Sequence, residues 1–547
     1  MRKFFIWLLP LTFLAIFYFY PLGKILGVSF ARGEGGALET FVEAATSASV
    51  RRVLGFTVWQ AALSTLLTLA AGLPGAYLLA RYDFRGKALF RAITGIPFVM
   101  PALVVAAGFN ALLGPNGWVN VILVHFDLSA PPIQFVNTFS AILVAHVFYN
   151  MTIVLRMVGD FWSHLDPRQG HAAQVLGANR WQTLWRITLP LLMPAIAAAV
   201  LLVFIFDFSS FAVVLMLGGP KFATLEVEIY YQANSLFNLP LAATLSTLQL
   251  ACTLALTVLY TRLSARVSRP LKLRSQAVTQ RRLADWRSRA LAGAVIGLLL
   301  VLLTTPLLAL AARSVTHLGP TRTRDGEISQ GLTLDFYREL SVNRRHSLFY
   351  APPATAILVS LGYAAMTAVL SLLMGLPAAW ALARDSESWL NRILDPLLML
   401  PLGTSAVTLG LGFIVALNRP PLDLRASPVL IPLAHTLVAF PFVVRSLTPA
   451  LRSVQPRLRD AAAVMGASPW RVFQAVDLPL VGRAVLAAAV FAFTISMGEF
   501  GATALVSRPE YPTVPVAIYR FLSRPGALNY GQGLALSTIL MGVTVVG

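Results

Sequence analysis

Twelve long apolar runs divide the chain, each about as long as a helix must be to cross a bilayer. A hydrocarbon core of about 30 Å takes about 20 mostly apolar residues in helical form. The runs lie near residues 4–22, 53–80, 93–113, 139–158, 189–217, 238–261, 289–312, 354–382, 393–417, 428–450, 480–507 and 530–547. They are continuous rather than alternating in polarity, which favours helices over barrel strands. Only 12% of the residues are charged, against roughly 25% in soluble domains. The sequence therefore predicts an all-α integral membrane protein with about twelve transmembrane helices.

The two ends of the sequence and its single cysteine each lead to a separate prediction. No small-x-small cleavage site closely follows the opening run, so we expect a retained first helix rather than a signal peptide. The last run is still apolar at Gly547, whereas its counterpart continues to Arg262, so we expect the natural chain to extend a few residues further. Intact-mass analysis of the native protein tests this. Cys252 lies inside the sixth run, which excludes an intramolecular disulfide and a thiol-ligated metal site.

The formal net charge of +20 is concentrated in a few connecting segments. Residues 261–289 hold nine Lys or Arg against one acid, and residues 81–91 hold four against Asp83. Cytoplasmic loops carry an excess of Lys and Arg, and a cytoplasmic N-terminus places both segments on that side. The loop 313–353 is Arg-rich on the other side, but long loops cross largely regardless of charge. The charge thus indicates topology in a lipid bilayer and argues against a nucleic-acid partner.

A polar segment between the fourth and fifth runs recurs between the tenth and eleventh. GANRWQTLWRITLP (177–190) is matched 289 positions later by GASPWRVFQAVDLP (466–479). The same register aligns residues 141–230 with 430–519 without a gap. The pairs in this register include His146 with His435, Arg156 with Arg445, Phe211 with Phe500 and Tyr230 with Tyr519.

The repeat extends upstream and divides the chain into two halves. AGLPGAYLLAR (71–81) matches MGLPAAWALAR (374–384) at an offset of 303. We therefore predict a first half at residues 1–262, a basic cytoplasmic linker at 263–289 and a second half at 290–547. Each half has six runs, and an even number leaves both halves facing the same way. The repeats are therefore parallel, related by an axis along the membrane normal.

The repeated segment has the signals of a short capped helix between two helix ends. Asn179 is placed to form a capping box with Gln182 in the first copy, and Ser468 is followed by Pro469 at the first helical position in the second. The glycine that opens each copy is expected to end the preceding helix, and the Leu-Pro that closes it to start the next span.

The first copy also carries an amphipathic stripe, formed by Trp181, Leu184, Trp185 and Thr188. A helix lying on the lipid headgroups accounts for one such stretch. Two copies that keep a Gly-Ala hinge, a tryptophan and a terminal Leu-Pro indicate instead two equivalent docking surfaces for a two-fold symmetric partner.

The segments HAAQVLGANRWQTLWRITLP and DAAAVMGASPWRVFQAVDLP resemble the Glu-Ala-Ala cytoplasmic loop of binding-protein-dependent ABC importer permeases. In that family the loop forms a coupling helix that seats in a cleft of the ATPase subunit. The resemblance implies coupling loops at 166–190 and 455–479, in which the matching residues are His171, Ala172, Ala173, Gly177, Ala178, Trp181, Leu189, Pro190, Asp460, Ala461, Ala462, Gly466, Ala467, Trp470, Leu478 and Pro479. The family usually opens its loop with Glu. Asp460 can substitute for that Glu, whereas His171 departs from it.

The whole plan of six plus six spans resembles the fused permeases of ferric-iron and thiamine uptake systems. Ferric iron is the first solute expected from that resemblance and thiamine the second. The resemblance also implies an ATPase homodimer on the cytoplasmic side, an external solute-binding protein and a bacterial inner-membrane location. No G-x-x-x-x-G-K-[ST] occurs in the sequence, so ATP and Mg are expected on the partner subunits. The chain is then a transport subunit with no catalytic residue, bound cofactor or metal site of its own.

Acids inside the fifth run of each half are the first candidates for the solute path. Asp207 in FIFDFSSF and Glu499 in FTISMGEF are offset by three residues in the repeat, about one helical turn. Polar groups within spans are costly and tend to be functional. The candidate path residues are Asp207, Ser209, Ser210, Phe211, Ser496, Gly498, Glu499 and Phe500. The alternative is that each acid bonds to neighbouring hydroxyls or backbone and only tethers helices.

His146 and His435 are expected to form structural hydrogen bonds between helices rather than to bind a ligand. An ion-coupled secondary transporter also uses parallel repeats, but it would carry charges in several spans and has no need of two matching loops. A membrane-embedded enzyme is disfavoured, since no His/Asp/Glu set with metal-ligand spacing and no nucleophile motif occurs in the sequence.

Overall fold

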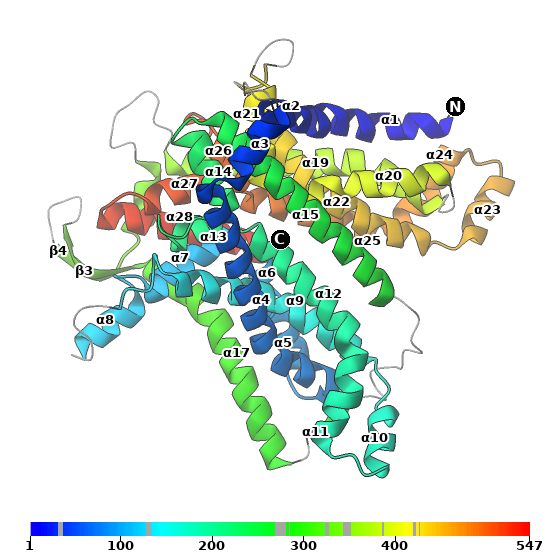
Figure 1. Cartoon of the computed structure of the whole chain (residues 1–547), viewed down its shortest axis with the longest axis horizontal. Helices are drawn as coiled ribbons and strands as arrows, with labels where there is room; N and C mark the ends of the chain where they lie inside the picture. Colours follow the sequence, from blue (N-terminus) through cyan, green and yellow to red (C-terminus); the bar gives the residue numbers. More distant parts are fainter. Residues whose placement is uncertain are drawn as a thin grey trace. The chain divides into compact units, whose positions relative to one another are not determined.

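The computed structural model describes residues 2–30, 37–126, 133–267, 280–283, 285–322, 328–342, 352–384, 388–418, 423–425 and 427–546 (Figure 1). Helices form almost all of the regular structure in these ranges, which confirms the all-α membrane class. Gly547 and the linker residues 268–279 and 284 lie outside the described residues.

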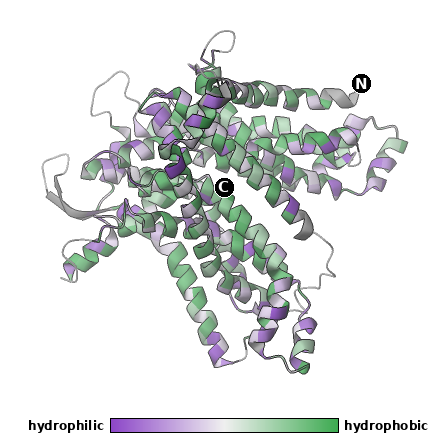
Figure 2. Ribbon diagram, in the orientation of Figure 1, coloured by the Kyte–Doolittle hydropathy of each residue, from purple (hydrophilic) through white to green (hydrophobic). Residues whose placement is uncertain are grey.

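Ten helices in the described ranges are long and apolar enough to cross a membrane. A bent pair, Trp389–Gly403 with Ala406–Ala416, turns by 94° and covers the ninth predicted run. The twelfth run is a helix, Ala527–Val546, which is not among these ten. Figure 2 shows apolar residues along the long helices and hydrophilic residues gathered in the polar repeats.

The chain forms two compact units. Unit 1 comprises Met1–Ser47, Glu228–Leu250 and Leu334–Gly547. Its helices are α1 (Arg2–Leu14), η1 (Ala15–Phe19), α2 (Tyr20–Phe30), α3 (Ala37–Thr46), α18 (Asp335–Arg338), η3 (Glu339–Ser341), α19 (Pro353–Arg384), α20 (Trp389–Met399), η4 (Leu400–Gly403), α21 (Ala406–Ala416), α22 (Leu430–Arg452), α23 (Pro456–Val464), α24 (Pro469–Val472), η5 (Phe473–Asp477), α25 (Leu478–Gly498), α26 (Gly501–Val506), α27 (Val514–Leu522) and α28 (Ala527–Val546).

Unit 2 comprises Ala48–Val227 and Ala251–Thr333. Its elements are α4 (Ala48–Arg81), β1 (Tyr82–Asp83), α5 (Lys87–Ile93), α6 (Ile96–Val99), α7 (Ala102–Leu113), α8 (Trp118–His125), α9 (Phe139–Ser163), α10 (Arg168–Val175), α11 (Arg180–Thr183), η2 (Leu184–Thr188), α12 (Leu189–Phe208), α13 (Ala212–Leu217), β2 (Arg281–Arg282), α17 (Trp286–Arg313), β3 (Thr316–Arg322) and β4 (Ile328–Leu332). Two helices, α14 (Leu225–Asn234) and α15 (Leu239–Val267), belong partly to each unit. The strands pair β1 with β2 in parallel and β3 with β4 antiparallel.

Equivalent helices of the two sequence halves pack in the same way. In unit 2, α4 packs mainly against α9 and α12. In unit 1, α19 is the counterpart of α4 and packs against α22 and α25, the counterparts of α9 and α12. Apolar side chains fill both sets of contacts, for example Val154 and Val158 in unit 2 and Val443 and Leu447 in unit 1. The repeated sequence therefore folds into a repeated three-helix core.

The first span of each sequence half packs in the unit that holds most of the other half. Helices α1 and α2 lie in unit 1 against α19 and α21, and α17 lies in unit 2 against α7. Glycines allow close approach at both places, since a Cβ at Gly412 would lie 3.0 Å from Pro21 and one at Gly108 would lie 2.9 Å from the Pro306 carbonyl oxygen. The compact units are thus distinct from the sequence halves, and the predicted boundaries at 262 and 290 describe the repeat only.

Several predicted spans are interrupted where the sequence holds proline or polar residues. The third run begins as α5 and α6 and becomes a long helix only after Pro101. The fifth run ends as α12 at Phe208 and resumes as α13, and the eleventh ends as α25 at Gly498 and resumes as α26. Both candidate acids therefore lie next to a helix break.

Candidate functional site

Each polar repeat forms a helical hairpin that turns at its glycine. Gly177 has φ of +90° and Gly466 has φ of +83°. Nothing lies within 4 Å of a Cβ built at either glycine, so the left-handed backbone rather than crowding favours glycine there. The Gly177 N–H donates to the Gln174 carbonyl and the Ala178 N–H to the Ala173 carbonyl, at 3.0 and 2.9 Å. This is the Schellman arrangement that ends a helix, and it confirms the predicted hinge.

The helix after each glycine begins with the predicted caps. In the first loop the Gln182 N–H donates to Asn179 Oδ1 at 2.8 Å, and the Asn179 N–H donates to Gln182 Oε1 at 2.9 Å. In the second loop the Arg471 N–H donates to Ser468 Oγ, and Pro469 begins α24. The predicted start of the next spans at the Leu-Pro pair is wrong, because the helix runs without a break from the caps through a π-helical turn, over Trp181–Phe208 and Pro469–Gly498.

The two loops have the same exposure along their length. Residues 171–179 and 460–468 share the same burial at every position. The agreement continues from 181 and 470 to the Leu-Pro pair, except at two positions where the second loop is more buried. The matching residues are exposed at His171, Asp460, Ala172, Ala461, Gly177, Gly466, Trp181, Trp470, Pro190 and Pro479, and half-buried at Ala173, Ala462, Ala178, Ala467, Leu189 and Leu478. The repeated sequence therefore also presents the same pattern of exposed residues twice.

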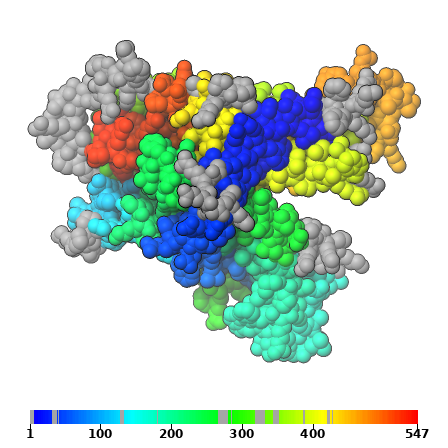
Figure 3. Space-filling view, turned by 45° about the horizontal axis from the view of Figure 1, so that its top comes forward, coloured from blue at the N-terminus to red at the C-terminus, as the bar shows by residue number. Residues whose placement is uncertain are grey.

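Each loop ends its first helix in two apolar side chains that face solvent. Val175 and Leu176 are 87% and 88% exposed, and their counterparts Val464 and Met465 are 89% and 87% exposed. We call these two pairs the apolar tips. In the space-filling view the orange segment around α23 and α24 projects from the surface of unit 1 (Figure 3). An exposed apolar pair kept in two copies marks an interaction surface.

The predicted amphipathic stripe of the first loop is wrong in its periodicity. Residues Leu184–Thr188 form a π-helix, which shifts the side chains that follow relative to an α-helix. Trp181 is 70% and Trp185 62% exposed, and the buried residue of the turn is Thr183. Both tryptophans therefore add to the exposed surface of the loop.

The second loop contains a buried ion pair that the first loop lacks. Arg459 Nε lies 2.6 Å from Asp477 Oδ1, and Trp380 Nε1 donates to Asp477 Oδ2 at 3.2 Å. The Arg459 guanidinium also donates to the Leu451 carbonyl at 2.8 Å. The equivalent positions in the first half are Gly170, Thr188 and Tyr77. The ion pair ties α23 to the start of α25, so the second loop is held more firmly than the first.

The basic linker reaches the first loop. Arg281, in β2, hydrogen bonds through its guanidinium to His171 Nε2. Strand β2 pairs with β1 at the end of α4, which holds Arg281 in place. Asp460 occupies the position equivalent to His171 and is exposed on α23. The residue that departs from the family pattern therefore has a partner within the chain.

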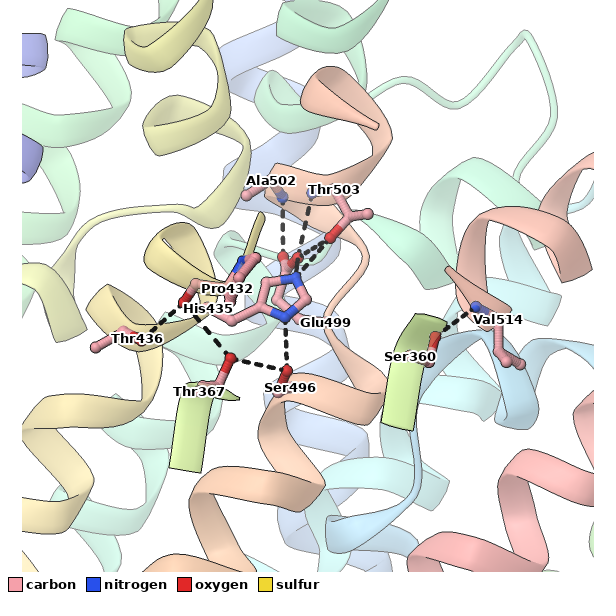
Figure 4. A network of polar contacts seen from close by, with 10 residues as sticks. All are labelled: Ser360, Thr367, Pro432, His435, Thr436, Ser496, Glu499, Ala502, Thr503 and Val514. Atoms are coloured by element: carbon pink, nitrogen blue, oxygen red, sulfur yellow. Dashed lines mark hydrogen bonds and ion pairs between the residues drawn. The ribbon is translucent and has the colours of Figure 1, made fainter. Parts of the chain in front are cut away.

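The acid of the second half is bonded to its own helix break (Figure 4). Glu499 Oε1 accepts from the Ala502 N–H at 2.8 Å, and Oε2 accepts from the Thr503 hydroxyl at 2.6 Å. His435 Nε2 lies 3.2 Å from Glu499 Oε2, and His435 Nδ1 lies 2.7 Å from Ser496 Oγ. Glu499 thus caps the first turn of α26 and holds the histidine of α22.

The acid of the first half makes the equivalent contact from the other side of its histidine. His146 Nδ1 lies 3.3 Å from Asp207 Oδ1, and His146 Nε2 lies 2.8 Å from Ser210 Oγ. Asn150 Nδ2 donates to Asp207 Oδ1 at 2.7 Å, and Gln60 Nε2 donates to the Asp207 carbonyl at 2.6 Å. Each of these residues is in unit 2.

The two pairs are reciprocal in the repeat register. Asp207 aligns with Ser496 and Ser210 aligns with Glu499, so each histidine has an acid at one ring nitrogen and a serine at the other. This explains the three-residue offset between the acids. In the described conformation both acids are buried inside their own units, the arrangement given as the alternative to path lining. That Asp207 and Glu499 line the path stays a prediction.

The other candidate path residues lie at or near the same helix breaks. Ser209 donates its hydroxyl to the Ile205 carbonyl at 2.7 Å, and Phe211 and Phe500 are buried. Gly498 ends α25. Within the described part of the chain, no group of three or more His, Cys, Asp or Glu side chains is placed to hold a metal ion.

Comparisons with known proteins agree with the geometry. The family described as the binding-protein-dependent transport system inner membrane component matches residues 72–269 and 371–545. The thiamine transport system permease protein ThiP of Brucella abortus (strain 2308) is 28% identical over 523 residues, which cover 95% of this chain and 90% of that protein. ThiP of Escherichia coli (strain K12) is 27% identical over 507 residues, covering 89% and 86%. A probable ABC transporter permease protein, y4fN, of Sinorhizobium fredii (strain NBRC 101917 / NGR234) is 26% identical over 515 residues, covering 93% and 88%.

The two matched segments each contain one polar loop and together exceed half of the chain. With two matching loops and a helical membrane core, this chain belongs to the family of inner-membrane permease components of binding-protein-dependent ABC importers.

Proposed function

We propose that this permease imports thiamine, delivered by an external binding protein and driven by an ATPase homodimer that docks on the two polar loops. The paired apolar tips carry the docking proposal, because two equal exposed surfaces on one chain suit two copies of one partner. ATP and Mg would be bound by the ATPase alone, and the N-terminus would lie in the cytoplasm, on the side of the loops. The chain would perform no covalent chemistry.

The proposed identity of the solute is based on the relatives with similar sequences. Two relatives described as thiamine transport permeases match about nine-tenths of this chain. Ferric iron, the first solute expected from the sequence, has no support from these relatives, so thiamine takes its place. An ion-coupled secondary transporter is set aside, since the family depends on a binding protein.

Charging both apolar tips should remove the ATPase. We expect Leu176→Asp with Met465→Asp to weaken ATPase binding by about 30-fold or more, since a central apolar contact in an interface contributes about 2 kcal/mol or more. Each single variant should retain partial binding through the other loop. The measurement is co-purification of the ATPase from native membranes, followed by titration of the purified subunits in nanodiscs.

The matched control is Leu332→Asp. Leu332 is 86% exposed, close to the 88% of Leu176, but it is the last residue of β4, after the first span of the second half. ATPase binding should be unchanged in this variant. Binding by the double tip variant equal to that of the intact chain would contradict the docking proposal.

A further inference from the structure

A cavity of about 490 Å³ opens within unit 1 where two connections and the end of α21 meet. The connection between α21 and α22 contributes Asn418 and Arg425, and the connection after α26 contributes Ser507 and Arg508. Helices α21 and α26 pack against each other next to it (Figure 1). We call this cavity the arginine pocket. All of its lining residues belong to unit 1, so one compact unit forms it alone.

The lining of the arginine pocket combines positive charge with an apolar floor. Arg425 and Arg508 come from different connections, and Asp423 is the one acid among the lining residues. All three residues are exposed, and within the described ranges neither guanidinium is paired with an acid. Phe413 and Leu430 also line the pocket but are buried. A group that is apolar at one end and carries a carboxylate at the other fits this lining, because a guanidinium binds a carboxylate through two hydrogen bonds.

Backbone hydrogen bonds hold both arginines at the pocket. The Arg425 N–H donates to the Leu417 carbonyl at the end of α21, at 3.1 Å. The N–H of Ser507, which precedes Arg508, donates to the Thr503 carbonyl in α26 at 2.8 Å. The two charges are therefore positioned by the ends of two packed helices.

The first half fills the equivalent space. Arg508 aligns with Gly219 in the repeat register. The Asn137 N–H, just before α9, donates to the Leu217 carbonyl at 2.8 Å, and a Cβ at Gly219 would lie 2.8 Å from Asn137 Oδ1. The two connections therefore touch each other in unit 2, whereas a pocket separates them in unit 1. Of the two described copies, the second alone presents paired arginines here.

The arginine pocket and the second polar loop lie at opposite ends of α22. Leu430 begins this helix, and Arg452 ends it shortly before α23. Its 23 residues rise about 35 Å, which is enough to cross the hydrocarbon core. Figure 1 shows α26 near one end of α22 and α23 beyond the other. With the polar loops on the cytoplasmic side, as in the proposed function, the pocket opens on the external side.

The charge of the pocket selects its partner. Thiamine carries a positive thiazolium ring, which two arginines repel, so the pocket does not suit the proposed solute. The family depends on a binding protein, which reaches the permease from the external side. A protein loop presents acidic and apolar side chains next to each other, and arginine is enriched in protein interfaces. The lining therefore favours an acidic loop over the solute.

We propose that the arginine pocket is a docking site for the external binding protein and receives a Glu or Asp side chain from a loop on its surface. This inference rests on the proposed import function. It adds that docking is unequal between the halves, because the second half alone holds the acid in this way.

Charge reversal tests the docking site. Arg425→Glu with Arg508→Glu is assembled with the ATPase in nanodiscs and titrated with purified, thiamine-loaded binding protein. We expect the Kd to rise by at least about 30-fold, since both attractive contacts become repulsive. The Kd of the intact complex should also rise more steeply with salt than that of the variant. Co-purification of the ATPase with the variant verifies that it is folded.

The matched control is Lys221→Glu with Arg338→Glu, which makes the same change in charge. Lys221 follows α13 and Arg338 ends α18, just before α19, so both lie on the side opposite the polar loops. Neither lines the arginine pocket. The Kd should change by less than about threefold, because exposed charges are screened by salt. A control that weakens binding as much as the pocket variant would overturn the proposal, since net charge alone would then explain the loss.

A photo-cross-linker identifies the occupant directly. Ser507→Cys with Cys252→Ser carries a benzophenone maleimide at the pocket, and we expect it to join the binding protein at a peptide that contains Asp or Glu. Labelling of lipid alone would overturn the proposal. Equal binding to the intact and charge-reversed complexes would overturn the docking site alone. A binding protein that does not bind the intact complex would overturn the proposed function together with the site.

Discussion

Replacing Asp477 with threonine is expected to lower the free energy of unfolding by about 3–5 kcal/mol, because removing one partner leaves a buried charge uncompensated. The Asp477 side chain is fully buried, and that of Arg459 is 14% exposed. Trp380 Nε1 loses its acceptor in the same change. The measurement is the midpoint of unfolding in mixed detergent and SDS micelles, followed by tryptophan fluorescence.

The first half supplies the control for this prediction. Its equivalents of Arg459 and Asp477 are Gly170 and Thr188, and its loop is built without an ion pair. Arg459→Gly with Asp477→Thr therefore removes both charges together, and most of the lost stability should return. A double variant as unstable as Asp477→Thr would show that the ion pair is not the cause.

Replacing Glu499 with serine should be the second most damaging change, with a loss of about 3 kcal/mol or more. The substitution leaves the Ala502 N–H and the Thr503 hydroxyl without the carboxylate that accepts from them. Each buried donor left without an acceptor costs about 1–3 kcal/mol. His435 also loses the carboxylate beside its Nε2, which keeps the Thr503 hydroxyl as a partner. The same unfolding assay measures this loss.

The reciprocal arrangement of the first half again gives the control. Ser496→Asp with Glu499→Ser copies the order of Asp207 and Ser210 around the histidine. The double variant should be more stable than Glu499→Ser alone, since an acid returns to His435 from its Nδ1 side. Equal instability of both variants would mean that capping of α26, and not the histidine contact, explains the loss.

Features that depend on neighbouring residues could be predicted from the sequence. The hinges at Gly177 and Gly466 and the capping box of Asn179 with Gln182 were visible because each involves residues within one turn. The apolar runs likewise placed most spans within a few residues. Local signals of this kind are strong because few alternative partners compete within one turn.

Features that depend on distant partners could not be predicted. The exchange of the first spans between units needs the packing of α2 on α21 and of α17 on α7, and no sequence pattern encodes it. The three-residue offset of Asp207 and Glu499 is visible in the sequence. Its cause is not, because each acid contacts a different ring nitrogen of its histidine. Arg459 and Asp477 could have been noticed, because opposite charges appear together in only one copy of the repeat.

The most direct test of the central claim is ATP hydrolysis by this permease and its co-purified ATPase in nanodiscs, measured with and without an external thiamine-binding protein. We expect the ATPase to remain bound to the chain, and thiamine-loaded binding protein to stimulate hydrolysis above the level with the unloaded protein. A chain that retains no ATPase and moves thiamine on an ion gradient alone would contradict the claim.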